Sequence, residues 1–215
     1  MSRSGTLRLG LGFLLLVTLS TGGYLATSSI YLMAKAELAQ YLLEHSWASA
    51  KANQRQSKPW PWADTHPIAK LSVDKLDWSA IILAGTSGEA LAFGPGHWRD
   101  SAQPGTLGNS VIAGHRESHF NILKSLHIGD SVRIERRDGQ MIKYVVDTVN
   151  VVHETDLTVL ANSDETKLTL ITCYPVEAVT AGGELRLAIT ASANARDDLI
   201  QPRATSSGNL LLTKI

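Results

Sequence analysis

The chain has a single cysteine, Cys173, among its 215 residues. One cysteine excludes an internal disulfide, so cysteine usage does not indicate whether the compartment is oxidising. The chain also lacks a net charge, because its 20 basic residues balance its 20 acidic residues. A chain without a net positive field attracts nucleic acid poorly, and we expect no nucleic-acid partner. The lone thiol is then free, paired between molecules, or reactive.

Charged side chains are absent from residues 9–33. A helix of this length and composition is sufficient to cross a bilayer. Arg3 and Arg8 precede the stretch, whereas Lys35 is the one basic residue that follows it closely. The positive-inside rule therefore places residues 1–8 in the cytoplasm. A cleavable signal peptide is the alternative, but the apolar run exceeds a typical signal core and its cleavage sites are poor. We therefore predict a single-pass anchor in the cytoplasmic membrane, with the rest of the chain outside it.

Proline is absent from residues 34–57, which are rich in alanine, leucine, glutamine and charged residues. This composition favours a helix that leaves the membrane as a stalk. The sequence PWPW at residues 59–62 ends it, because proline cannot continue a helix. We assign residues 34–62 to the stalk and a Pro/Trp linker. Trp60 and Trp62 could sit at the lipid headgroups, but we expect them to pack on the domain that follows.

Short apolar runs separated by turn residues occupy residues 63–193. An Asp-Gly pair at residues 138–139, between two alternating runs, predicts a hairpin. One short helix is expected over residues 118–126, and residues 194–215 form a polar tail. The predicted strands cover residues 69–73, 79–84, 90–93, 110–113, 131–136, 141–152, 167–172 and 184–191. Eight short strands indicate an all-β barrel or sandwich, and closure would remove exposed edges.

Cys173 follows directly on one of these strands. Since side chains alternate across a sheet, Cys173 shares a face with Thr169, opposite to the leucine face. Arg186 likewise lies opposite to the leucine face of the next strand. If these two strands pair antiparallel, Cys173 and Arg186 become neighbours on the outer surface of the barrel.

A cysteine nucleophile needs a base or a positive neighbour, because few thiols are ionised at neutral pH. His115 is the best candidate, since it follows a strand and a glycine. It could protonate a leaving amine and later deprotonate an incoming one, while Arg186 stabilises an oxyanion. The opposing interpretation is a buried, inert thiol with a structural histidine and a surface arginine.

Three motifs carry a family resemblance. The sequence TLITC at residues 169–173 resembles the sortase signature around the nucleophilic cysteine, and Arg186 stands where the sortase arginine is expected. The sequence AGHR at residues 113–116 resembles the surroundings of the sortase histidine. The sequences PWPWAD at residues 59–64, FGPGH at residues 93–97 and CYP at residues 173–175 are similar to the proteobacterial branch called class GN.

The resemblance implies a closed eight-stranded sortase barrel with Cys173 as nucleophile, His115 as general acid and base, and Arg186 as ligand of the substrate and oxyanion. Thr172 and Thr169 would line the peptide site. Such enzymes cleave a C-terminal signal of the Leu-Pro-x-Thr-Gly kind, hold the acyl group as a thioester and pass it to an amine. The resemblance implies no cofactor and no metal. A proteobacterial setting puts the catalytic domain in the periplasm and leaves the amine acceptor open.

Three other functions are compatible with the sequence. A zinc enzyme is suggested by His115 and His119, four residues apart, with His153 as a further ligand. Gly114 argues against it, because it places His115 outside the helix. A hydrolytic cysteine peptidase would use the same thioester chemistry with water as acceptor. A membrane-tethered binding module without chemistry would bury Cys173 as an inert thiol.

Overall fold

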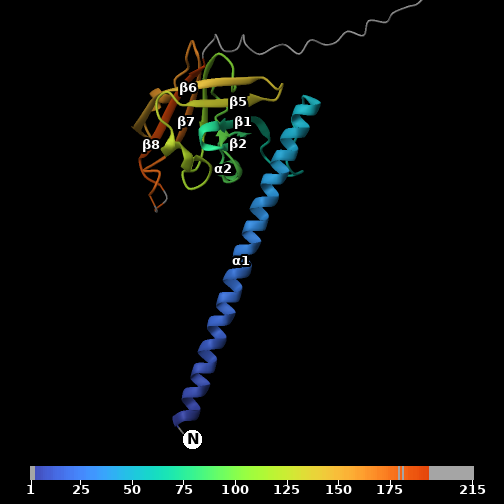
Figure 1. Ribbon diagram of the computed structural model, residues 1–215, viewed down its shortest axis with the longest axis vertical. Coiled ribbons are helices and arrows are strands. Elements are labelled where there is room, and N and C mark those ends of the chain that lie inside the picture. The colour runs from blue at the N-terminus through green and yellow to red at the C-terminus, as the bar shows by residue number, and fades with distance from the viewer. Residues whose placement is uncertain (1–2, 179, 181, 194–215) are drawn as a thin grey trace, which may run out of the picture.

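The structure of the protein is a computed structural model that describes residues 3–178, 180 and 182–193. A single helix, α1, covers Arg3–Asn53 and is followed by a barrel (Figure 1). Its first part has the length and apolar composition required to cross a membrane. Figure 1 shows that part extending away from the barrel, with only the C-terminal part of α1 lying against it. The predicted tail at residues 194–215 lies outside the described residues.

Eight strands close the barrel in the order β1-β2-β3-β4-β7-β8-β6-β5. Their bounds are Pro67–Val73 (β1), Trp78–Ala84 (β2), Gly96–His97 (β3), Gly108–Ala113 (β4), Ser131–Arg136 (β5), Met141–His153 (β6), Thr166–Tyr174 (β7) and Leu185–Ala193 (β8). The short helices are η1 (Asp74–Leu76), α2 (Gly88–Phe93), η2 (His119–Ser125) and η3 (Leu157–Leu160). The predicted closed eight-stranded barrel is confirmed.

Alternating side chains fill the barrel. In β1 every second residue is buried, as the period of a strand requires. One apolar cluster joins residues of β1, β2 and β4 to β8, and η2 closes it with Phe120 and Leu123. Leu168 and Leu170 belong to this cluster, as does Ile189, so the leucine faces of β7 and β8 do point inward. The outward face of these strands is therefore available for a site.

The parallel pairing of β4 with β7 brings distant segments together. The long strand β6 pairs with β5 and β8, whereas β7 lies between β8 and β4. β4 and β7 run parallel, with Ala113 opposite Ile171. Parallel neighbours need a long crossover, and here the connection contains η2, the β5–β6 hairpin and η3. The ends of β4 and β7 therefore meet at the same edge of the barrel.

The C-terminal part of α1 is built into the domain. Leu43 and Trp47 are buried against Ile81 and Leu83 of β2. An ion pair between Lys51 Nζ and Glu135 Oε1, 2.6 Å apart, ties the end of the helix to β5. The stalk is thus part of the fold, and the barrel is held at a fixed place on the helix.

The sequence prediction was wrong at the third strand. Residues 90–93 belong to α2, because Ser87 caps this helix by accepting a hydrogen bond from the amide of Ala90. The strand of this region is instead β3, two residues long, which has too few residues to show a period. The predicted helix over residues 118–126 is the 3-10 helix η2.

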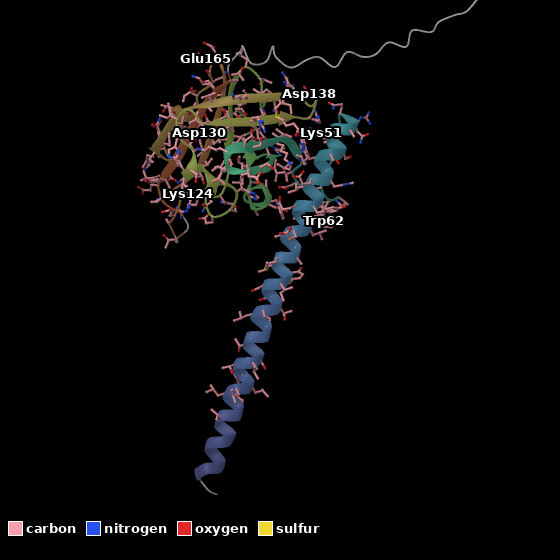
Figure 2. All side chains as sticks on the ribbon, viewed as in Figure 1. Lys51, Trp62, Lys124, Asp130, Asp138 and Glu165 are labelled. Carbon is pink, nitrogen blue, oxygen red and sulfur yellow. The ribbon has the colours of Figure 1, made fainter. Side chains whose placement is uncertain are left out.

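The two linker tryptophans behave differently. The ring of Trp60 meets that of Phe93 edge to face, with centroids 4.9 Å apart, so its predicted packing on the domain is confirmed. Trp62 is 80% exposed, and the same prediction was wrong for it. Figure 2 shows Trp62 beside α1, at the height where the helix reaches the barrel.

Candidate active site

Cys173 and Arg186 are directly opposite each other in the antiparallel ladder of β7 and β8. The two residues therefore lie side by side on one face of the sheet. The predicted antiparallel pairing is confirmed. Cys173 is half-buried, and its outward direction follows from the inward burial of Leu168 and Leu170 two residues apart on the same strand.

His115 lies on the other side of Cys173. It comes two residues after the last residue of β4, and β4 is the other neighbour of β7. The β4–β7 register sets Ala113 opposite Ile171, and its continuation brings His115 level with Cys173. The amide of Gly114 donates to the carbonyl of Ile171 at 3.1 Å, which extends the pairing toward His115. The His115 side chain is exposed. β7 and β8 thus supply the thiol and the guanidinium, and the loop that follows β4, the other neighbour of β7, supplies the histidine.

Arg186 is held by three acceptors. Its Nη1 donates to the carbonyls of Gly183 and Leu185 at 2.7 and 2.9 Å, and its Nη2 lies 2.5 Å from Glu154 Oε2. The Arg186 side chain is 27% exposed. The guanidinium of the residue opposite Cys173 is therefore held by three acceptors while its side chain stays partly exposed.

The two threonines of the TLITC motif are buried, and their hydroxyls make hydrogen bonds within the protein. Thr172 Oγ1 donates to the carbonyl of Gly114 at 2.7 Å, and Thr169 Oγ1 donates to Asn109 Oδ1 at 2.8 Å. Their side chains are 2% and 0% exposed. Both hydroxyls donate to acceptors within the protein, and the expectation that both threonines line the peptide site stays a prediction. Thr172 instead ties the strand of Cys173 to the loop of His115.

Arg116 is a residue of this site whose role the sequence analysis missed. Its side chain is 1% exposed, its Nη1 donates to the carbonyl of Pro175 at 3.0 Å, and its Nη2 donates to the carbonyl of Thr180. Its Nε pairs with Glu117 Oε1 at 3.0 Å. Arg116 therefore binds the loop between β7 and β8 to the segment that carries His115. Its position directly after a candidate catalytic histidine was the available signal.

Gly114 is required by close packing. A Cβ atom at this position would come within 2.7 Å of the ring of Phe120, which is fully buried. Since Phe120 belongs to the barrel core, the ring cannot easily move away. The absence of a side chain at Gly114 lets the segment before His115 lie directly on η2.

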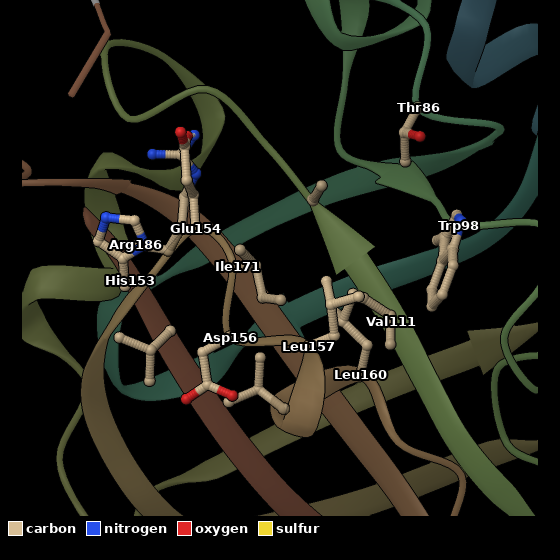
Figure 3. A pocket seen from close by; sticks show the side chains of 13 residues that line it. Thr86, Trp98, Val111, His153, Glu154, Asp156, Leu157, Leu160, Ile171 and Arg186 are labelled. Atoms are coloured by element: carbon tan, nitrogen blue, oxygen red, sulfur yellow. Dashed lines mark hydrogen bonds and ion pairs between the residues drawn. The ribbon is translucent and has the colours of Figure 1, made fainter. Parts of the chain in front are cut away.

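A cavity of about 240 Å³ adjoins Arg186 (Figure 3). Apolar side chains make up most of its wall, including Val111, Ile171 and Leu160. Figure 3 shows Arg186 with Glu154 on one side of the cavity and Trp98 with Thr86 on the other. The remaining lining residues are Ala113, Val152, His153, Asp156, Leu157 and Val159. The cavity fits apolar side chains of a ligand whose polar backbone reaches the guanidinium.

Two ionisable groups near the site have displaced pKa values. Burial lowers the pKa of His119, and the proximity of His115 lowers it further. At the cavity, hydrogen bonds from the hydroxyl and the amide of Thr158 lower the pKa of Asp156. His119 is therefore neutral at neutral pH, and Asp156 is ionised at the cavity wall.

His153, the third histidine of the zinc alternative, has other partners. His153 lies at the end of β6, where its Nδ1 is 2.8 Å from Thr155 Oγ1 and its Nε2 is 3.5 Å from Glu184 Oε2. His119 begins η2. Among the described residues, no three histidine, cysteine, aspartate or glutamate side chains come together as a metal site would require.

Comparison with known proteins identifies the family. The model of the sortase domain matches residues 71–194, which is more than half of the chain. The chain belongs to the sortase family. A curated sortase relative, Sortase D of Bacillus subtilis (strain 168), is 31% identical over 106 residues, which are 49% of this chain and 53% of that protein. The alignment thus spans about half of the length of this relative.

Solved sortase structures share the fold. The structure of a Clostridium perfringens Sortase D5 transpeptidase superposes with a TM-score of 0.60 at 23% identity, over 74% of this chain and 99% of that chain. Sortase A from Corynebacterium diphtheriae superposes with a TM-score of 0.55 at 33% identity, over 62% of this chain and 63% of that chain. The barrel described above is therefore a sortase barrel.

Proposed function

We propose that this sortase is a membrane-anchored cysteine transpeptidase that joins proteins with a C-terminal sorting signal to an amine. The observation that carries the proposal is the register of β7 and β8, which puts Cys173 opposite Arg186. The parallel pairing of β4 with β7 supports the choice of His115, because His115 follows the end of β4. Cys173 is the nucleophile, His115 the general acid and base, and Arg186 the ligand of the substrate and oxyanion.

Acylation begins with attack of the Cys173 thiolate on the carbonyl carbon of the signal threonine. A C–S bond forms, and the carbonyl oxygen becomes an oxyanion that Arg186 stabilises. The C–N bond to the following glycine then breaks as protonated His115 gives its proton to the leaving amine. The products are a thioester on Cys173 and a free C-terminal fragment that begins with glycine.

Deacylation reverses the proton transfer. Neutral His115 takes a proton from an incoming amine, whose nitrogen attacks the thioester carbonyl. A new C–N bond forms, the C–S bond breaks, and the Cys173 thiolate is restored. The net reaction exchanges one amide for another and consumes no cofactor.

The substrate is a signal of the Leu-Pro-x-Thr-Gly kind. The apolar walls of the cavity beside Arg186 are suited to its leucine and proline side chains, which precede the cleaved bond. Thr172 and Thr169 act below this surface, where their hydrogen bonds fix the strand that carries the thiol. Their contribution to the substrate is the position of Cys173.

Membrane attachment follows from α1, which is long and apolar enough to span a bilayer. We place residues 9–33 in the cytoplasmic membrane, with residues 1–8 inside and the barrel in the periplasm of a Gram-negative cell. The motifs at residues 59–64 and 93–97 support assignment to the class GN branch. The amine acceptor is then a periplasmic or surface molecule.

The test uses the full chain in a non-ionic detergent, with a Leu-Pro-x-Thr-Gly peptide and an amine. We expect intact-mass measurement to detect an acyl group on Cys173 and a ligated peptide in the supernatant. Cys173→Ala should abolish both. If hydrolysed peptide forms at the same rate with and without the amine, the protein is a peptidase. If no acyl-enzyme forms with several signal variants, the proposal is wrong.

A further inference from the structure

A second cavity, of about 410 Å³, lies at the opposite end of β4 from the candidate active site. Thr106, two residues before β4, lines it, whereas His115 comes after the other end of the strand. The six residues of β4 separate the two ends by about 17 Å. The other lining residues are Gln54, Gln56, His66, Ile68, Gln103, Pro104, Arg136, Arg137 and Asp138.

Hydrogen bonds fix the walls of this cavity. Gln54 Nε2 donates to the carbonyls of Lys51 and Arg137, at 2.7 and 3.0 Å, and so joins the end of α1 to the β5–β6 hairpin. The amide of Gly105 donates to the hydroxyl of Tyr144 at 3.0 Å and fixes the loop before β4. Figure 2 shows Asp138 at the hairpin tip and Lys51 near the adjoining end of the helix.

Positive charge gathers around the cavity although the chain as a whole is neutral. Arg136 pairs with Asp138 at 3.1 Å, and Asp138 is the only acidic side chain among the described residues that line the cavity. Eleven ion pairs form within the described part of the chain, one of them the Arg136–Asp138 pair at the cavity. None of these eleven pairs includes Arg137, Arg99 or Lys58. The unneutralised guanidinium of Arg137 remains available to an external anion.

His66 lines the cavity and also senses two cations that lie beyond the cavity lining. Burial lowers its pKa, and the neighbouring Arg99, Arg137 and Lys58 lower it further. These cations come from three separate segments: the linker after α1, the loop after β3 and the β5–β6 hairpin. A bound anion would reverse this repulsion, because it would neutralise the cations and stabilise protonated His66.

We propose that this cavity binds an oxyanion, a phosphate or a carboxylate, carried on a small organic molecule. Arg137 offers the planar fork of donors that suits both groups. Gln103 adds an amide and Thr106 a hydroxyl from the facing loop. The cavity volume lies in the range of small-molecule sites and exceeds what one phosphate group needs. The inference does not rest on the proposed transpeptidase chemistry, and only the choice of a dissolved anion uses the proposed membrane placement.

The geometry excludes the headgroups of the anchoring membrane as the source of this anion. Gln54 follows α1 directly, and twenty residues of helix separate Met33 from Asn53. At 1.5 Å per residue, this part of the helix is about 30 Å long. The cavity therefore opens well above the proposed membrane surface, where dissolved molecules reach it.

Histidine NMR on the full chain in detergent tests the proposal. Inorganic phosphate and citrate are titrated separately, with sodium chloride holding the ionic strength constant, and the ring signal of each histidine is followed. We expect a saturable shift of the His66 signal and a rise in the pKa of His66 on binding. The anion that binds more tightly identifies the phosphate or the carboxylate class.

Two variants separate a site from general screening. Arg137→Gln should weaken anion binding about tenfold, as expected for loss of one charge-assisted contact. Lys143→Gln removes the same charge from an exposed position on β6 outside the cavity and should change binding less than about twofold. Equal effects of the two variants would overturn the proposal, as would an equal His66 response to chloride alone. Gln103→Ala, which leaves all charges in place, should also weaken binding.

Discussion

Cys173 and Arg186 occupy directly opposed positions on two antiparallel strands, so the β7–β8 ladder itself sets their separation. Opposed residues in such a ladder have Cβ atoms about 5 Å apart. The guanidinium is further fixed by the carbonyls of Gly183 and Leu185 and by Glu154. The pair therefore does not depend on a mobile loop for its alignment.

Arg186→Lys tests this alignment. A lysine ammonium cannot keep the contacts to two carbonyls and Glu154 while it reaches an oxyanion, so kcat/KM for transpeptidation should fall about a hundredfold or more. The melting temperature should change little, because the side chain lies at the surface. Glu184→Gln, a neutralised exposed carboxylate next to β8, is the control and should retain most activity. Full activity in Arg186→Lys would contradict the assigned role.

Thr172→Val tests the link between the strand of Cys173 and the loop of His115. Valine has a similar shape but leaves the carbonyl of Gly114 without its donor, which costs about 1 kcal/mol of stability. We expect kcat/KM to fall by about tenfold through displacement of His115. Thr172→Ser keeps the hydroxyl and should restore both quantities. Equal kinetics in the valine and serine variants would show that this hydrogen bond is unimportant.

Arg116→Met tests the link to the β7–β8 loop. The change retains an apolar stem and removes the donors to the carbonyls of Pro175 and Thr180. We expect faster cleavage of this loop by a protease and a lower kcat/KM, because the loop begins next to Cys173. Arg116→Lys should recover part of the loss, since lysine can reach one carbonyl. A variant with unchanged loop cleavage and unchanged kinetics would count against this link.

Acid pH should destabilise the barrel through buried histidines. His97 is 2% exposed, its Nε2 lies 2.8 Å from the carbonyl of Ala102, and burial lowers its pKa from 6.5. Below about pH 6.5 this histidine binds a proton more readily in the unfolded chain than in the folded chain. The free energy of unfolding therefore falls as the pH falls. His66 and His119, whose pKa values are also lowered, act in the same direction.

Thermal unfolding of the full chain at about pH 7.5 and about pH 5.5 measures this effect. We expect a lower melting temperature at the lower pH. His97→Gln should have a lower melting temperature at the higher pH but a smaller change between the two conditions. An unchanged pH dependence in His97→Gln would assign the effect to other groups.

Leu43→Ala tests whether the stalk stabilises the barrel. Leu43 is fully buried against β2, so its truncation should cost about 3 kcal/mol and lower the melting temperature of the barrel. Leu38→Ala on the same helix removes a side chain that is 56% exposed and should have little effect. Similar melting temperatures for the two variants would mean that helix and barrel are energetically separate.

The local features of the fold were predictable from the sequence because they rest on local chemistry. Alternation in β7 and β8 predicted the inward leucines and the outward Cys173 and Arg186, which become neighbours once the two strands pair antiparallel. Residues 90–93 were mistaken for a strand because four residues show no clear period, and the capping by Ser87 decided for a helix.

The non-local features were not predictable from pattern alone. The parallel pairing of β4 with β7 joins segments far apart in the chain, and no local signal encodes it. The burial of Thr169 follows from its hydrogen bond to Asn109 on that partner strand. The role of Arg116 likewise depends on the path of the β7–β8 loop.

Because α1 is one continuous helix, the number of residues before the barrel determines which way the candidate active site faces around the helix axis. Each residue of an α-helix advances the chain by 1.5 Å and turns it by about 100°. Leu43 and Trp47 fix the barrel to one face of α1. Inserting two residues before Ala39 would therefore rotate Cys173 to roughly the opposite side of the helix axis, relative to the N-terminal part of α1. Four inserted residues would return it to within about 40° of its original bearing, about 6 Å further from the proposed membrane surface.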